Sequence, residues 1–412
     1  MRTCTHPICS VQKKRSVITY GRQAANQFTL LVFLSTAVMP TFLKSQTSSA
    51  CSIQTLDEEI VCRDCAGVKA ILLNAEGSRV YSVNLEGMSV IEFDRSSKQK
   101  LRKLKFVATP GKGFDYSKKV WIDSYEEKPV EGCFTHDGRY LWLSLHNAKG
   151  VVIWDLWNHD TYVEGRPYKE AWLYDYSAPR ADQSPMPEKK KVRLLWIQTG
   201  TTPKVVTAAP DGKYLFVSNW HSNTVSILDI ASHNPAEWKK IDDLSLGPIP
   251  RGLTVAQDSK TLYVAQMGGR TVSVVDLLKL QKIRSIDVGL NPRHLLIHNN
   301  CLYVSLNRPA KLVKIDLLQE RMMKTADTGR TPRTIVCTPD GRFLFVTCYK
   351  ENLVQLFATD SMQLLQSWES PGHPVCIDVF QHGNEIEAWV GNHTYGTVRR
   401  IHLKWSDETQ GN

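Results

Sequence analysis

The sequence lacks the short motifs that mark many enzyme active sites. It contains no HExxH zinc motif, no GxSxG nucleophile motif and no calcium loop of closely spaced carboxylates. The segment Gly111-Lys112-Gly113 is too short for a phosphate-binding loop and is not followed by a helical pattern. These absences argue against a site built from one continuous segment. A site assembled from distant segments leaves no such motif, so that class stays open.

Cysteine spacing gives equally little support for a metal or haem site. Cys62 and Cys65 form the one CxxC pair, and Ala66 stands where c-type haem attachment needs a histidine. A second CxxC that would complete a zinc site is missing. We predict a local disulfide for this pair, with Cys51 as an alternative partner, and buried thiols for most other cysteines. The sequence predicts neither a bound metal nor a cofactor.

Long hydrophobic runs are scarce as well. The stretch 28–43 has 16 residues, fewer than the roughly 20 that span a bilayer as a helix. It lies within residues 1–45, which hold six basic side chains and no acidic one, a pattern typical of an export signal. We expect cleavage near Ser45 or Ala50, with a retained anchor or lipidation at Cys51 as alternatives. The protein would then be periplasmic, on the cell surface or secreted. It would contact a membrane only through this segment, and only if the segment is uncleaved or lipidated.

The positive charge of the chain is concentrated in that leader. The whole sequence carries a net charge of +10, but without residues 1–45 it has 45 basic and 41 acidic side chains, a net of +4. Strong electrostatic attraction to nucleic acid is therefore not expected of the mature protein.

A repeated pattern covers most of the remaining sequence. A short apolar strand begins at a proline, which in several copies is followed by a basic residue. Asp-Gly or a similar pair then leads into an aromatic-rich strand, as in 202–219. A third strand that ends in aspartate and a more charged fourth strand follow. Two further copies lie at 128–156 and at 67–94, the latter without the proline. In the other copies the prolines are Pro203, Pro250, Pro292, Pro332 and Pro374.

Seven copies of about 40–45 residues with four antiparallel strands each predict an all-β fold, a seven-bladed β-propeller over residues 67–405. The last copy ends after its third strand, at 397–405. A strand at 52–61, inside the N-terminal segment 46–66, can supply the missing one. We therefore predict that this strand completes the last blade and closes the ring, with a short tail at 406–412.

The second strands carry a motif found in a known family. Tyr263-Val264-Ala265, Tyr303-Val304-Ser305, 216–219 and Phe345-Val346-Thr347 resemble the YVTN repeat. Over roughly 67–404 the chain resembles YncE-type propeller proteins. This resemblance implies a β-propeller but does not specify a function, because propellers serve as enzymes, receptors and scaffolds alike.

Loops that enter first strands and leave second strands share one face of a propeller, around the mouth of its channel. On this face we place a ring of cations that would attract carboxylate, phosphate or sulfate groups, with Glu131 replacing the cation in the second blade. The alternative is that each cation pairs with a neighbouring acid as part of the repeat. The ligand-binding candidates are Lys204, Arg251, Arg293, Arg333, Trp220, His221, Tyr349 and Asn392.

Two insertions flank the second blade. Residues 106–128 lengthen the loop into this blade on the proposed functional face, where they could form a lid or wall. Residues 157–191 extend the link between its third and fourth strands, toward the opposite face and the rim. We expect a flexible hairpin tip at 177–191.

These features support three functional hypotheses. The first is an exported scaffold or binding protein that holds an anionic small molecule, glycan or peptide, or a protein partner, at the channel mouth. The second is an enzyme resembling the propeller lactonases or streptogramin lyases, which would need a histidine and a carboxylate within hydrogen-bond reach. The third, a single-stranded nucleic-acid binder, is disfavoured by the net charge of the mature chain. The catalytic candidates are His146, His221, His393 and Glu131.

Overall fold

The computed structural model describes residues 51–177 and 187–407. Within these ranges the regular elements are β-strands, apart from one 3₁₀ turn at Pro235–Glu237. The chain divides into a unit of residues 1–48 and a unit of residues 49–412. The predicted export signal lies outside the described residues. In the described ranges no helix is long and apolar enough to cross a membrane.

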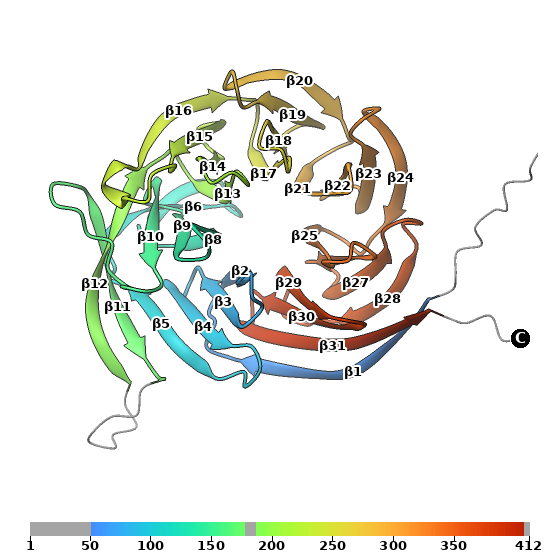
Figure 1. The fold of residues 1–412 in the computed structure, drawn as a ribbon, viewed down its shortest axis with the longest axis horizontal. Coiled ribbons are helices and arrows are strands. Elements are labelled where there is room, and N and C mark those ends of the chain that lie inside the picture. Colours follow the sequence, from blue (N-terminus) through green and yellow to red (C-terminus); the bar gives the residue numbers. More distant parts are fainter. Residues whose placement is uncertain (1–50, 178–186, 408–412) are drawn as a thin grey trace, which may run out of the picture. The chain divides into compact units, whose positions relative to one another are not determined.

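Consecutive strands form four-stranded antiparallel sheets (Figure 1). In one of them β13 (Pro203–Ala208), β14 (Tyr214–Asn219), β15 (Thr224–Asp229) and β16 (Lys239–Ser245) pair in chain order. Gly212, with φ of 72°, provides the left-handed residue of the turn between β13 and β14. Three more sheets repeat this order: β17 (Pro250–Val255), β18 (Thr261–Gln266), β19 (Thr271–Asp276) and β20 (Gln281–Asp287); β21 (Pro292–His298), β22 (Cys301–Leu306), β23 (Lys311–Asp316) and β24 (Arg321–Asp327); β25 (Pro332–Cys337), β26 (Phe343–Cys348), β27 (Leu353–Ala358) and β28 (Leu364–Glu369).

The hydrophobic core lies between adjacent sheets. Phe216 of β14 and Ile227 of β15 share one buried cluster with Leu262 and Val264 of β18. The two middle strands of a sheet are therefore buried almost throughout, whereas the fourth strand is mostly exposed. This difference explains why the second and third strands of each repeat are apolar and the fourth is charged.

The first described strand pairs with the last one. β1 (Cys51–Cys62) runs antiparallel to β31 (Thr397–Asp407), with Cys51 opposite Asp407 and Cys62 opposite Val398. Together with β30 (Glu385–Asn392) and β29 (Pro374–His382) they form a sheet in the order β1-β31-β30-β29. The segment 52–61, which the sequence analysis assigned to this sheet, lies in β1.

The first two repeats are joined into one nine-stranded sheet. The insertion 157–191 contributes β11, which pairs with β5 from Ala171 to Asp175 and with β12 along its whole length. In Figure 1 β11 and β12 lie on the outer side of this unit, toward the rim, where β11 joins the sheets of the first two repeats edge to edge. The predicted flexible tip at 177–191 is corrected in part: β12 already begins at Glu188, and 178–186 lie outside the described residues. The sheet contains β2 (Val68–Leu73), β3 (Arg79–Asn84), β4 (Ser89–Asp94), β5 (Lys100–Phe106), β11 (Tyr168–Asp175), β12 (Glu188–Gln198), β10 (Gly150–Asp155), β9 (Tyr140–Leu145) and β8 (Pro129–Thr135), in that order.

The strands that begin the repeats meet around the centre of this unit (Figure 1). Each of these strands contacts the next one, in the order β2, β8, β13, β17, β21, β25 and β29, and β29 contacts β2. The other insertion, 106–128, forms a separate hairpin of β6 (Pro110–Asp115) and β7 (Val120–Tyr125).

The predicted disulfide at the CxxC pair is absent. Cys62 and Cys65 are both free thiols, as are Cys133, Cys337 and Cys376.

Candidate functional site

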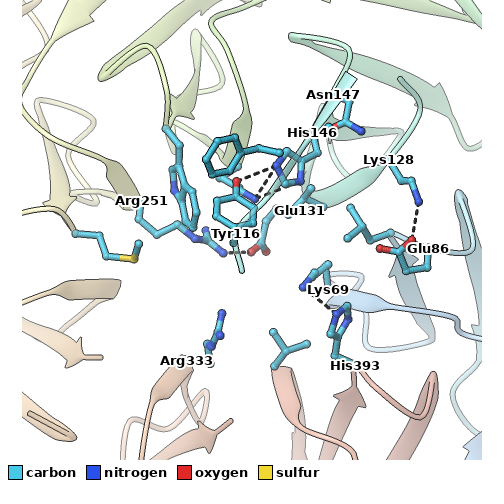
Figure 2. Close-up of a pocket in the computed structure, with 18 of the residues that line it drawn as sticks. Lys69, Glu86, Tyr116, Lys128, Glu131, His146, Asn147, Arg251, Arg333 and His393 are labelled. Atoms are coloured by element: carbon cyan, nitrogen blue, oxygen red, sulfur yellow. Dashed lines mark hydrogen bonds and ion pairs between the residues drawn. The ribbon is translucent and has the colours of Figure 1, made fainter. Parts of the chain in front are cut away.

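A cavity of about 650 Å³ lies where these central strands begin (Figure 2). The first residue of each central strand pairs with the last part of the second strand in the same repeat. Directly after this residue the register of the pairing shifts, so the next residue lies in a β-bulge. Such β-bulges re-aim a side chain. All residues at this bulge position line the cavity: Lys69, Val130, Lys204, Arg251, Arg293, Arg333 and Val375.

Val130, and not Glu131, occupies the bulge position of the second repeat, because Pro129 pairs with Leu145. The sequence analysis placed Glu131 there. Glu131 is one residue further along and also lines the cavity. Its Oε1 accepts a hydrogen bond of 2.7 Å from Nη2 of Arg251, so it acts as a counter-ion within the ring rather than as a member of it.

Buried hydroxyl groups hold the bulges in place. The Ser218 hydroxyl accepts a hydrogen bond from the Val205 amide and donates one of 3.0 Å to the Arg251 carbonyl in the next sheet. The Ser144 hydroxyl donates likewise to the Lys204 carbonyl. This bridge gives a structural reason for the serine or threonine in the second-strand motif, because the bulge would otherwise leave these backbone groups unpaired.

The loops that enter the bulges hold non-glycine residues in the left-handed conformation. Thr202 has φ of 61° and Ile249 has φ of 54°, values that are costly for β-branched side chains. Backbone of this kind persists where the surrounding structure enforces it, and it clusters at ligand sites. Further examples directly before the central prolines are Asn291, Thr331 and His373.

Lys204 is packed among rings rather than acids. Its Nζ lies 4.4 Å from the centre of the Trp220 ring and 3.3 Å from both ring nitrogens of His146. Burial, followed by repulsion from Arg251 and Lys69, lowers the pKa of Lys204 well below its usual range. The pKa of His146 is lowered well below its usual range by burial and by Lys204, so this imidazole is neutral at physiological pH.

The arginines of the ring are buried and incompletely paired. Within the described ranges, Nε and Nη1 of Arg251 and Nε of Arg333 have no hydrogen-bond partner. Arg333 lies 4.1 Å above the Tyr349 ring, and burial lowers its pKa to about 10. Burial and the charges of Arg333 and Arg251 lower the pKa of Arg293 well below its usual range. Unpaired buried donors of this kind are costly unless an acceptor arrives.

Lys69 is a cation that the sequence analysis missed, because its repeat begins with Val68 in place of proline. Its Nζ lies 3.3 Å from Nε2 of His393. Burial and repulsion from Arg333, Arg293 and Arg251 lower the pKa of Lys69 to about 7. Alignment on the valine would have placed it in register with the other cations.

The β6–β7 hairpin forms one wall of the cavity. Phe114, Tyr116 and Ile122 line it, and the Tyr116 hydroxyl lies 3.1 Å from Nε2 of His146. His221 is not a lining residue. Its ring packs 4.9 Å from Phe114 and 5.4 Å from Trp121, and its Nδ1 lies 2.7 Å from the Thr202 hydroxyl. This residue therefore anchors the hairpin.

Asn392 is also not brought to the cavity. Its side-chain amide contacts the hydroxyls of Ser370 and Thr397 inside its own sheet region. The other predicted ligand-binding residues, Lys204, Trp220, Arg251, Arg293, Arg333 and Tyr349, all line the cavity.

The three candidate catalytic histidines are held by groups other than Glu131. His146 contacts Lys204 and Tyr116, His221 contacts Thr202, and His393 contacts Lys69. Across 51–177 and 187–407, no group of three or more His, Cys, Asp or Glu residues is arranged to hold a metal ion. The arrangement is suited to accepting negative charge and lacks the acid–base pair that the lactonase-like hypothesis requires.

Comparisons with known proteins establish the fold. The β-propeller domain of Cps50 (Swd1) from Myceliophteria thermophila superimposes with a TM-score of 0.59 at 11% identity, covering 85% of this chain and 99% of that domain. Hydrazine synthase from Kuenenia stuttgartiensis matches 64% of this chain and 76% of its own with a TM-score of 0.49 and 20% identity. Antigen Lp49 of Leptospira interrogans is 28% identical over 202 residues, which span 44% of each protein. No family model matches the sequence. The chain is an all-β protein with the fold of a β-propeller.

Proposed function

We propose that this protein is an exported, seven-bladed propeller of the YVTN-repeat, YncE-like kind, closed by β1, that binds an anionic small molecule, glycan or peptide in the central cavity. The observation that carries the proposal is the convergence of five cations from five strands. The described lining holds two carboxylates. Glu131 pairs with Arg251, and Glu86 pairs at 2.6 Å with Lys128, which lies outside the ring.

The energetics favour an anion as the missing partner. Lys69, Lys204, Arg293 and Arg333 each have a pKa lowered by burial, and repulsion from Arg251 lowers it further in all four. A carboxylate or phosphate would pair with the free donors and relieve this repulsion. The aromatic rings of Tyr116, Trp220 and Tyr349 offer additional contact area for a ring or an extended chain.

The location outside the cytoplasm is supported by the leader-like composition of residues 1–45. Binding is favoured over hydrolysis or lyase chemistry because Glu131 is engaged by Arg251 and the histidines lack a carboxylate partner.

A thermal-shift screen on residues 46–412 tests this function. Citrate, inorganic phosphate, an acidic oligosaccharide, an acidic peptide and a single-stranded oligonucleotide are compared with a neutral oligosaccharide. We expect a multivalent anion to raise the unfolding temperature, and we expect the Arg293→Met/Arg333→Met variant to lose most of the rise.

The matched control is Arg284→Met, which removes an arginine of the outer strand β20 that pairs with Glu320. It should leave the shift intact. An anion site in the cavity would be contradicted if anions stabilised the double variant and Arg284→Met equally. It would also be contradicted if no anion stabilised the unsubstituted protein. A response to the oligonucleotide alone would favour the nucleic-acid hypothesis.

A further inference from the structure

Lys69 differs from the other cations of the cavity in its surroundings. It lies at the start of β2, half-buried, and the nearest polar group to its Nζ is an imidazole nitrogen of His393. The charged groups that lower its pKa are Arg333, Arg293 and Arg251; the Cys376 thiol acts in the opposite direction, and Lys204 is a further cation within electrostatic reach. In Figure 2 the side chains of Lys69, Arg251 and Arg333 point into the same central space. A primary amine, a neutral base and several guanidinium groups thus share one enclosure.

We propose that Lys69 is a nucleophile that forms an imine with the carbonyl carbon of an oxo acid, while the arginines of the cavity hold the carboxylate of that acid. The inference rests on the proposed function, because the same cations that attract an anion would present its carbonyl to the amine. The class of ligand is thereby narrowed to small carboxylates that carry a ketone or aldehyde.

The chemistry balances without a further reactant. The lone pair of the neutral amine forms a bond between Nζ and the carbonyl carbon, and the carbonyl oxygen becomes a hydroxyl. A proton passes from the nitrogen to that oxygen, with His393 as the nearby base that can carry it. The second amine proton follows, the C–O bond breaks, and water leaves as the C=N bond forms. No electron is gained or lost overall.

The state of the amine fits this role. Attack requires the neutral form, and cationic neighbours favour that form of a lysine. At pH 7 about half of the Lys69 side chains are neutral with a pKa of about 7, against fewer than about one in a thousand for an ordinary lysine. Burial and Lys69 itself lower the pKa of His393 to about 4, so its imidazole is neutral and Nε2 can accept a hydrogen bond from the amine.

Two other lysines line the same cavity and serve as internal comparisons. Lys128 is engaged in an ion pair of 2.6 Å with Glu86. Lys204 is covered by Trp220 and Tyr116 and is only 6% exposed. Lys128 thus has an acidic partner, and Lys204 is shielded from a ligand. Lys69 has a neutral imidazole beside it and is more exposed than Lys204, so we expect the imine to form at Lys69.

The test is reductive trapping on the protein 46–412. Pyruvate and 2-oxoglutarate are incubated with the protein at pH 7 in the presence of sodium cyanoborohydride, which converts an imine to a stable secondary amine. Peptide mapping by mass spectrometry then locates the adduct. We expect at least about tenfold more adduct at Lys69 than at Lys128, because the Lys128 side chain is engaged by Glu86, and none at this position in Lys69→Arg.

The Lys69→Arg variant retains the positive charge, so it should still be stabilised by citrate, which has no carbonyl carbon able to form an imine. Citrate binding without an adduct at Lys69 overturns the imine proposal and leaves the anion site standing. An adduct distributed evenly over surface lysines, or located at Lys204, also overturns it. Failure of the oxo acids to bind, while the acidic oligosaccharide or the acidic peptide still stabilises the protein, overturns the imine proposal alone. Failure of every anion in the thermal-shift screen overturns the proposed function as well.

Discussion

Cations at the outer edges of the sheets differ in their partners from cations at the inner ends. On the outside, Arg284 pairs with Glu320, and Arg270 pairs with Asp287 at 2.8 Å with both side chains more than half exposed. At the inner ends Lys204 and Arg333 face aromatic rings instead of acids. The same repeat can evidently provide a counter-ion where one is needed. The scarcity of counter-ions among the described residues of the cavity, where Glu131 pairs with Arg251, is the reason why we propose an anionic ligand there.

The largest effect is expected where the inner ring does have a counter-ion. Glu131→Gln leaves Arg251 buried without a negative partner, and we expect a loss of about 3 kcal/mol in the free energy of unfolding without ligand. Urea denaturation measures it. Stabilisation by citrate should increase in this variant, since a competing negative charge is gone. Glu320→Gln on the outside should cost less than about 1 kcal/mol, and equal losses at both sites would remove the distinction between the two regions.

The next effect concerns the cost of burying an unpaired cation. Lys69→Met should raise the stability of the ligand-free protein by roughly 1–3 kcal/mol at pH 6. The folded pKa of Lys69, about 7, lies below its ordinary value of 10.5. Between these values the unfolded chain binds more protons, so the stability of the unsubstituted protein rises with pH and the advantage of the variant shrinks.

Denaturation at pH 6, 8 and 10 gives this profile. Lys311→Met, which removes an exposed lysine paired with Asp327, is the matched control and should show no such trend. If the difference in free energy of unfolding between Lys69→Met and the unsubstituted protein did not change with pH, the charge of Lys69 would not be the cause of the destabilisation.

A smaller effect is expected from the hydroxyl that supports a bulge. Ser218→Ala removes the group that joins the Val205 amide to the Arg251 carbonyl, and we expect a loss of about 1–2 kcal/mol. Because Arg251 is then less firmly held, citrate should also bind more weakly. Ser245→Ala, in the exposed β16, is the comparison and should change neither stability nor binding. Isothermal titration calorimetry measures the affinity for citrate, and urea denaturation measures the free energy of unfolding.

The smallest effect is expected at the outer ion pairs. Arg270→Met removes one partner of an exposed pair and should change the free energy of unfolding by less than about 0.5 kcal/mol. Differential scanning calorimetry measures this change. A loss of stability as large as that of Glu131→Gln would show that the outer ion pairs stabilise the protein as much as the pair in the cavity does.

Much of this arrangement could be predicted from the sequence because it is carried by the repeat. The prolines and the basic residues that follow them fix where each central strand begins, and turn pairs such as Asp211-Gly212 fix where it ends. Lys204, Arg251, Arg293 and Arg333 could be assigned to one opening on that basis alone. Lys69 was missed because the search used the proline rather than the pairing position.

Val130 directly follows Pro129, as Lys204 follows Pro203, so strict alignment on the proline would have placed Val130 rather than Glu131 in register with the cations.

The rest depends on contacts between distant segments. The partner of Glu131, Arg251, is 120 residues away. The insertion 157–191 could be recognised as an interruption, but its pairing with β5 depends on a free sheet edge that the sequence does not show. His221 broke the repeat as a ligand-binding residue would, yet it supports the hairpin.

The pairing of β1 with β31 sets the order in which the molecule can be completed. A ribosome or an export channel delivers β1 first, and its partner arrives with the other end of the chain. Until then one strand of twelve residues has an unpaired edge. The closing sheet is thus a late, non-local step, and the cations of β2 and β25 are brought next to β29 only when it forms. A chain interrupted before residue 397 would lack β31, so β1 would have no partner strand and the central cavity would not be enclosed by a complete last sheet.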